Sequence, residues 1–74
     1  MALPVLSGRE VIKALSKAGF NAVLQRGSHV IMVKEGAHPP IRDTVPLHKT
    51  VKKGTLRAII SQSGLSTKEF LGLL

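Results

Sequence analysis

Three histidines are the side chains best suited to proton transfer near neutral pH, because the chain has no cysteine and only four acidic residues. His29 lies in the stretch QRGSHVIMV, directly after Gly-Ser and before an apolar β-like run. It can be interpreted as a polar residue at a hairpin corner, or as a general acid or base aimed at a basic surface. RNA carries its own nucleophile, the 2′-hydroxyl, so a histidine with nearby lysines has the groups needed to cleave it.

The other two histidines are less suited to catalysis. His38 lies in a proline-bounded loop and is expected to be exposed and inert. His48 precedes a basic connection, where a structural or phosphate-contact role is favoured over catalysis. Metal binding requires several ligands to converge, and the irregular spacing of the histidines does not favour this. The sequence also lacks a phosphate-cradling glycine loop, so neither a metal nor a small-molecule cofactor is expected.

The segment KTVKKGTLR contains the second group of functional candidates. Lys52 and Lys53 stand directly before Gly54 and Thr55, where a helix is predicted to begin. The free N–H groups and the positive dipole end of a helix favour phosphate, and lysines at that position strengthen an anion site. The alternative is a solvated loop. The RNA-binding candidates are Lys49, Lys52, Lys53, Arg57, Arg26 and Ser28.

Charge is the strongest feature of the composition. Eleven Lys and Arg against four Asp and Glu give the 74-residue chain a net charge of +7, which favours a polyanionic partner. With two Phe and no Trp or Tyr, base stacking cannot be the main mode of binding, so recognition of backbone and shape is favoured. The lysines are scattered instead of forming one face of a long helix, so a membrane-surface role is not favoured.

The length and the terminal segment bear on organisation and location. We expect a single domain spanning residues 1–74, without a linker or repeat. The start MALPVLSGRE lacks the pattern of a signal peptide, and no run of eighteen apolar residues predicts a membrane-spanning helix. The absence of cysteine fits a reducing compartment, and a cytoplasmic location is expected.

The elements that position these residues follow from capping and periodicity. Ser7 and Glu10 form a capping-box pattern at the start of a helix that is predicted to end at Gly19, with Phe20 folding back onto it. Two strands are predicted within residues 21–36, joined at Gly27-Ser28. The alternating segment 41–47 predicts a short third strand at an edge.

Two further helices are predicted towards the C-terminus. Residues 55–64 place Leu56, Ile59 and Ile60 at helical spacing before Gly64, and a second capping box opens the segment 66–74. Three strands with short connections must form an antiparallel meander. We therefore predict an α+β fold of order α-β-β-β-α-α, a three-stranded sheet with its helices packed on one face and the other face or the edge open to solvent.

Several ordered segments resemble the HicA toxin family of toxin–antitoxin modules. They are SGREVIKALSKAGF, RGSHVIMV, TVPLH and KKGTLRAIISQSGLSTKEFLGLL, and together they cover nearly all of residues 7–74. The resemblance implies a double-stranded-RNA-binding-domain-like fold and a ribosome-independent mRNA interferase. It places the catalytic histidine in Gly27-Ser28-His29 and phosphate-binding lysines at Lys52 and Lys53. It also implies mRNA as substrate and a HicB-like antitoxin as partner.

One position departs from the family pattern. Many members have Gly-Ser-His-His where this chain has Val30. Alternation along a strand sends residue 30 to the face opposite His29, so we expect the substitution to be tolerated. Two other functions remain open: a non-catalytic RNA-binding module with the same basic surface, and an interaction protein whose charge serves an acidic partner.

Overall fold

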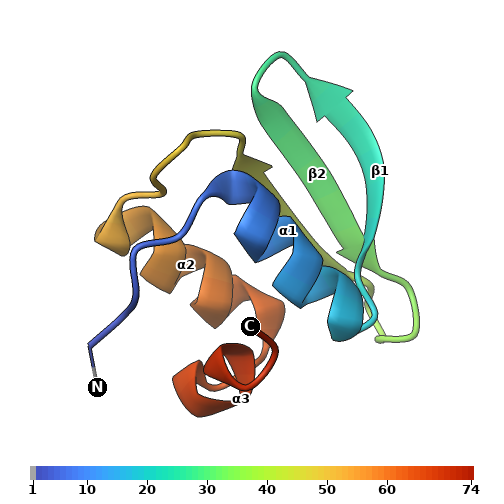
Figure 1. The fold of residues 1–74 in the computed structure, drawn as a ribbon. Helices are drawn as coiled ribbons and strands as arrows, with labels where there is room; N and C mark the ends of the chain where they lie inside the picture. Colours follow the sequence, from blue (N-terminus) through green and yellow to red (C-terminus); the bar gives the residue numbers. More distant parts are fainter. Residues whose placement is uncertain (1) are drawn as a thin grey trace.

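The computed structural model describes residues 2–74. In chain order the elements are α1 (Gly8–Lys17), β1 (Asn21–Arg26), β2 (His29–Lys34), β3 (Ile41–Pro46), α2 (Lys53–Ser63) and α3 (Thr67–Leu71) (Figure 1). This α+β order and the three-stranded antiparallel sheet confirm the predicted fold class, and they are consistent with a double-stranded-RNA-binding-domain-like architecture. No helix within these residues is long and apolar enough to cross a membrane.

The ends of α1 are fixed by local sequence. The Ser7 hydroxyl accepts from the Glu10 N–H, and the Glu10 carboxylate accepts from the Ser7 N–H, which completes the predicted capping box. At the other end Gly19 has φ +96°, and the Phe20 N–H donates back to the Leu15 carbonyl. This is the bond pattern of a Schellman motif, and it directs the buried Phe20 ring onto the helix as predicted.

The predicted signals mark the end of α2 and the start of α3. Gly64 ends α2 with φ +79°, a left-handed conformation that glycine adopts without strain. Ser66 and Glu69 form the second capping box at the start of α3. Hydrogen bonds from Ser66 hold the pKa of the Glu69 carboxyl below its ordinary value.

The strands form a meander in the order β1-β2-β3, so β1 and β3 are edges. Arg26 pairs with His29 at the hairpin turn, and His29 pairs in turn with Pro46 on β3. The register of β1 against β2 shifts at Val23, which indicates a bulge. Every residue of β1 is exposed, so this edge strand belongs to the sheet through its pairing with β2 and contributes no buried side chain.

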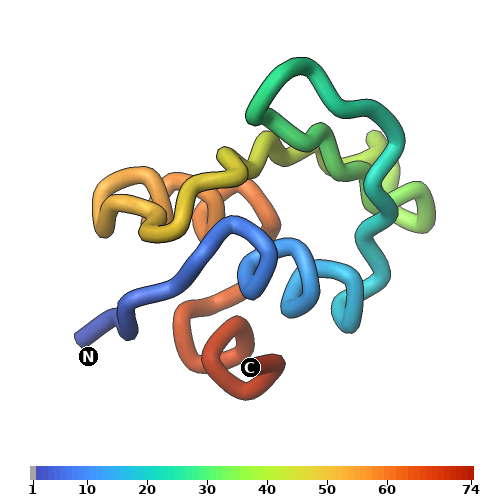
Figure 2. The backbone as a smooth tube through the Cα atoms, turned by 45° about the horizontal axis from the view of Figure 1, so that its top comes forward, coloured from blue at the N-terminus to red at the C-terminus, as the bar shows by residue number. Residues whose placement is uncertain are grey.

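The helices cover one face of the sheet, and the core lies between the two layers (Figures 1 and 2). From the sheet, Val30, Met32 and Val45 point into this core. The helical side consists of the apolar stripes of α1 and α2 with Phe70 of α3: Val11, Ala14, Leu15, Leu56, Ile59, Ile60 and Phe70. Within residues 2–74, no helix covers the opposite sheet face, which carries His29 and its cross-strand partners (Figures 1 and 2).

The connection between β3 and α2 is held by the N-terminal segment. The Gly8 N–H donates to the His48 carbonyl at 2.9 Å, and the Val51 N–H donates to the Leu6 carbonyl at 2.7 Å. Gly8 is buried so closely against the backbone of Pro46 and Leu47 that a Cβ atom there would overlap it. The start of α1 therefore fixes the path of the chain after β3.

Candidate functional site

His29 is the first residue of β2 and is exposed on the open face of the sheet. Gly27 has φ +57° at the first turn position, as in the two-residue turns that suit antiparallel hairpins. The Gln25 side-chain amide donates to the Gly27 carbonyl at 3.1 Å, which ties the turn to β1. Residues directly opposite each other in a sheet share a face, so Arg26 and Pro46 flank His29 on either side.

A cavity of about 300 Å³ opens beside His29, where β2 begins, β3 ends and α2 starts. We call it the histidine cavity. His29 is joined there by a second histidine, a lysine and two hydroxyl side chains. The complete lining is His29, Thr44, Pro46, His48, Lys52 and Thr55. All of these side chains except Pro46 are exposed, and no carboxylate lies among them. The cavity therefore combines two titratable imidazoles with positive charge, a suitable environment for a phosphodiester.

The sequence-based candidates are only partly brought together. His29 and Lys52 share the histidine cavity, whereas Lys53 is the next residue along and is exposed outside its lining. Lys49 and Arg57 are exposed on the preceding connection and on α2. Arg26 lies across from His29 on β1. Ser28 is exposed in the turn, and its carbonyl accepts from the Leu47 N–H at 2.6 Å.

The start of α2 has the features of an anion site. Lys52 is the N-cap residue, and no side chain caps the helix there. The helix begins one residue before Gly54-Thr55, at Lys53, so both lysines lie at the helix terminus. Uncapped N–H groups in the first turn and the helix dipole attract phosphate, and the two ammonium groups add to this attraction.

The sequence favours a structural or phosphate-contact role for His48. The structure adds that its side chain lines the same cavity as His29, which the sequence did not predict. Thr44 and Thr55 were not singled out at all. The available signal was the meander itself, because pairing the start of the second strand with the end of the third brings residue 48 back towards residue 29.

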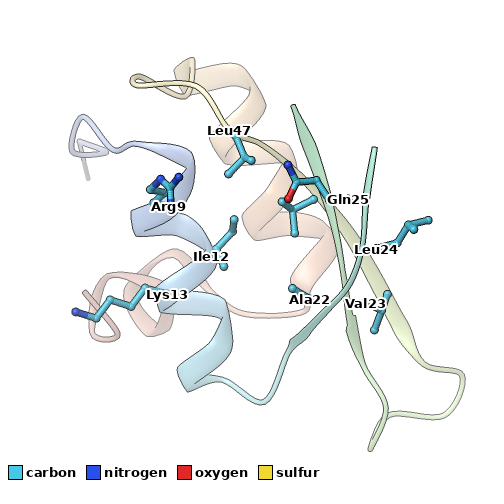
Figure 3. A pocket seen from close by; sticks show the side chains of 9 residues that line it. Arg9, Ile12, Lys13, Ala22, Val23, Leu24, Gln25 and Leu47 are labelled. Carbon is cyan, nitrogen blue, oxygen red and sulfur yellow. The ribbon is translucent and has the colours of Figure 1, made fainter. Parts of the chain in front are cut away.

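A larger cavity, of about 610 Å³, lies between α1 and β1 (Figure 3). Among residues 2–74, the ionisable groups that line it are the basic side chains of Arg9 and Lys13. Ala22 and Gln25 face this cavity from the strand, whereas the Leu24 side chain points away from α1. Because no histidine or carboxylate of the described residues lines it, this cavity is the weaker candidate for a catalytic site despite its size.

The acidic residues do not join the histidine cavity. Asp43 is buried on the helix-facing side of β3, and burial raises the pKa of its carboxyl to about 7. Glu35 is exposed beyond the end of β2. Among residues 2–74 no group of three His, Cys, Asp or Glu side chains converges as metal ligands do.

Val30, the position at which the sequence departs from the pattern of the family it resembles, is 6% exposed and part of the core. Its side chain lies on the helix-facing side of the sheet, opposite His29, as alternation predicted. A residue at this position does not line the histidine cavity.

Fold and site together define a class of protein. It is a small basic α+β protein with a double-stranded-RNA-binding-domain-like fold and an exposed cavity lined by histidine and lysine. The chain belongs to the HicA family: the family profile described as HicA toxin of bacterial toxin-antitoxin matches residues 8–65. Membership implies a toxin of a toxin–antitoxin module, with a cognate antitoxin as its partner. Comparison with curated proteins gave no match.

Proposed function

We propose that this toxin is a ribosome-independent mRNA interferase, an endoribonuclease that cleaves RNA by histidine acid–base catalysis without a metal cofactor. The observation that carries the proposal is that the family's Gly-Ser-His histidine and an N-cap lysine line one cavity. Lysine holds phosphate, and histidine exchanges protons near neutral pH. These are the two tasks that RNA transesterification requires.

The bound RNA would place a phosphodiester against the start of α2. Lys52 and the first-turn N–H groups attract its non-bridging oxygens, and Lys53 adds charge from the next position. Lys49, Arg57, Arg26 and Ser28 lie outside the cavity, where they serve phosphates further along the strand. Because such contacts are electrostatic, they give affinity with little sequence preference.

His29 then takes the proton from a 2′-hydroxyl or gives one to the leaving 5′-oxygen. The 2′-oxygen attacks the adjacent phosphorus, the bond from phosphorus to the 5′-oxygen breaks, and a 2′,3′-cyclic phosphate and a 5′-hydroxyl result. No water nucleophile is needed in this step, so cleavage should survive a chelator.

The experiment compares wild type, His29→Ala and His38→Ala on RNA in the presence of chelator. His38 is the matched control, since it is an exposed histidine outside the histidine cavity. His29→Ala should keep its fold and RNA affinity but lose roughly 10²-fold or more in cleavage rate, the usual scale for one general acid or base. His38→Ala should cleave like wild type. If the wild-type protein binds RNA without cleaving it, the proposed ribonuclease activity is refuted and a non-catalytic RNA-binding module is supported.

A further inference from the structure

We propose that His48 is a second catalytic residue, which carries out the proton transfer that His29 does not. This inference rests on the proposed ribonuclease function and goes beyond it. Transesterification of RNA needs a base for the 2′-hydroxyl and an acid for the 5′-oxygen. One histidine supplies only one of these at a time, and the histidine cavity contains two.

The two histidines come from different segments whose backbones are bonded to each other. His29 pairs with Pro46, and the Leu47 N–H donates to the Ser28 carbonyl at 2.6 Å, which extends the contact beyond the end of β3. His48 follows directly, and its own carbonyl accepts from the Gly8 N–H at 2.9 Å. Main-chain hydrogen bonds therefore fix the backbone at both histidines.

The close packing of Gly8 fixes the backbone position of His48. Any side chain at residue 8 would overlap the backbone of Pro46 and Leu47, so the chain after β3 can follow its path only because a glycine lies there. The His48 side chain, in contrast, is exposed and is not used as a packing residue. Its environment is that of a group available to a ligand.

The groups around the pair are cationic or neutral. Lys52 lines the cavity from α2, Arg26 lies across from His29 on β1, and Lys49 follows His48 in the chain. Thr44 and Thr55 add hydroxyl groups. No carboxylate lines the cavity to take the second proton transfer, which leaves the other imidazole as the candidate for it.

In the proposed step a neutral imidazole accepts the 2′-hydroxyl proton while the 2′-oxygen forms its bond to phosphorus. The bond between phosphorus and the 5′-oxygen breaks, and the protonated second imidazole gives its proton to that oxygen. One histidine gains the proton that the other loses, so charge and atoms balance. Lys52 stabilises the extra negative charge on the phosphorane oxygens.

The test uses two matched RNA substrates, one natural and one with sulfur in place of the 5′-bridging oxygen at a single cleavage position. A thiolate leaves without protonation, so the modified substrate no longer needs the acid but still needs the base. Wild type, His29→Ala, His48→Ala and His48→Gln are measured on both, with His38→Ala as control. Thermal unfolding and RNA affinity are recorded for each variant to establish that it is folded.

We expect His48→Ala and His48→Gln to cleave natural RNA about 10²-fold or more slowly than wild type, with RNA affinity retained. On the sulfur substrate, the variants at one of the two positions, 29 or 48, should cleave at a rate near that of wild type. The variants at the other position should still cleave slowly. The site that is rescued is the acid.

Other outcomes overturn the inference. A His48 variant that cleaves natural RNA within a few-fold of wild type removes the residue from catalysis and leaves the proposed function intact. Slow His48 variants with rescue at both sites or at neither show that the two histidines do not divide the proton transfers. Wild type without any RNA cleavage refutes the proposed function, and the inference fails with it.

Discussion

Replacing the buried carboxyl of Asp43 should change how stability depends on pH. Asp43 is 5% exposed on β3, and its Oδ2 atom has no hydrogen-bond partner among residues 2–74. Burial raises the pKa of this carboxyl from 3.8 to about 7, against the smaller opposing effect of a hydrogen bond with the Thr44 backbone. An ionised carboxylate is therefore poorly accommodated in the folded protein, and a neutral group of the same shape should fit better.

The direction follows from proton linkage. Between the unfolded pKa of 3.8 and the folded pKa of about 7, the folded state holds a proton that the unfolded state releases. The contribution of Asp43 to stability is thus fully present below pH ~4 and is lost as pH rises towards ~7, at a slope of up to about 1.4 kcal/mol per pH unit. Over this interval of about 3 units the loss reaches at most about 4 kcal/mol. For a domain this small, each kcal/mol corresponds to roughly 4–8 °C in Tm.

The assay is thermal unfolding from pH 4 to pH 8 for wild type, Asp43→Asn and Glu35→Gln. Asp43→Asn should unfold near the wild-type temperature at pH 4 and clearly above it at pH 8. Glu35 is an exposed carboxylate, so Glu35→Gln makes the same change in net charge without relieving a buried one and should follow wild type. Parallel pH curves for Asp43→Asn and wild type would refute the assignment of a raised pKa.

Three further predictions follow from the site and its support. Neutralising Lys52 and Lys53 together should weaken binding to all RNA sequences alike and should reduce the dependence of log affinity on log salt concentration by about 1 unit per lost contact. Titration at several salt concentrations measures both effects, with Lys68→Ala as control. Unchanged affinity at low salt would place the RNA elsewhere. Gly8→Ala should lower Tm and cleavage together, because its Cβ overlaps the chain after β3, whereas Gly54→Ala, which meets open space, should leave Tm unchanged or raise it. The cognate antitoxin should cover the histidine cavity with acidic or polar groups. Its association rate should fall as salt concentration rises, which stopped-flow mixing measures. A complex that leaves the cavity open to RNA would contradict occlusion.

The elements were predictable because their signals are local. Each capping box needs a serine and a glutamate three residues apart, and the Phe20 contact needs only Gly19 in a left-handed conformation. The hairpin follows from Gly27-Ser28 between two apolar runs, and the two short connections between the three strands permit only a meander. The position of Val30 away from His29 followed from strand alternation alone.

The missed features depend on contacts between segments distant in sequence. His48 reads as a polar residue in a basic connection until the register of β3 against β2 and the bond from Gly8 are known. The burial of Asp43 could not be predicted from the sequence either. Strand alternation places Asp43 on one face with Ile41 and Val45, but it does not show how completely the helices cover that face. The bulge at Val23 has no turn residue to mark it.

The arrangement of the histidine cavity bears on how the proposed activity is controlled. Its side chains other than Pro46 are exposed, and the backbone that carries His29 and His48 is fixed by main-chain bonds. The backbone of this site is therefore set when the protein folds. Its positive charge also speeds the approach of any polyanion. On the proposed function, such a protein is expected to be active as soon as it is free, and we propose that the inhibiting partner competes for the same surface. That requirement matches the cognate antitoxin implied by the family, and it explains why the basic cavity and the antitoxin contact should coincide.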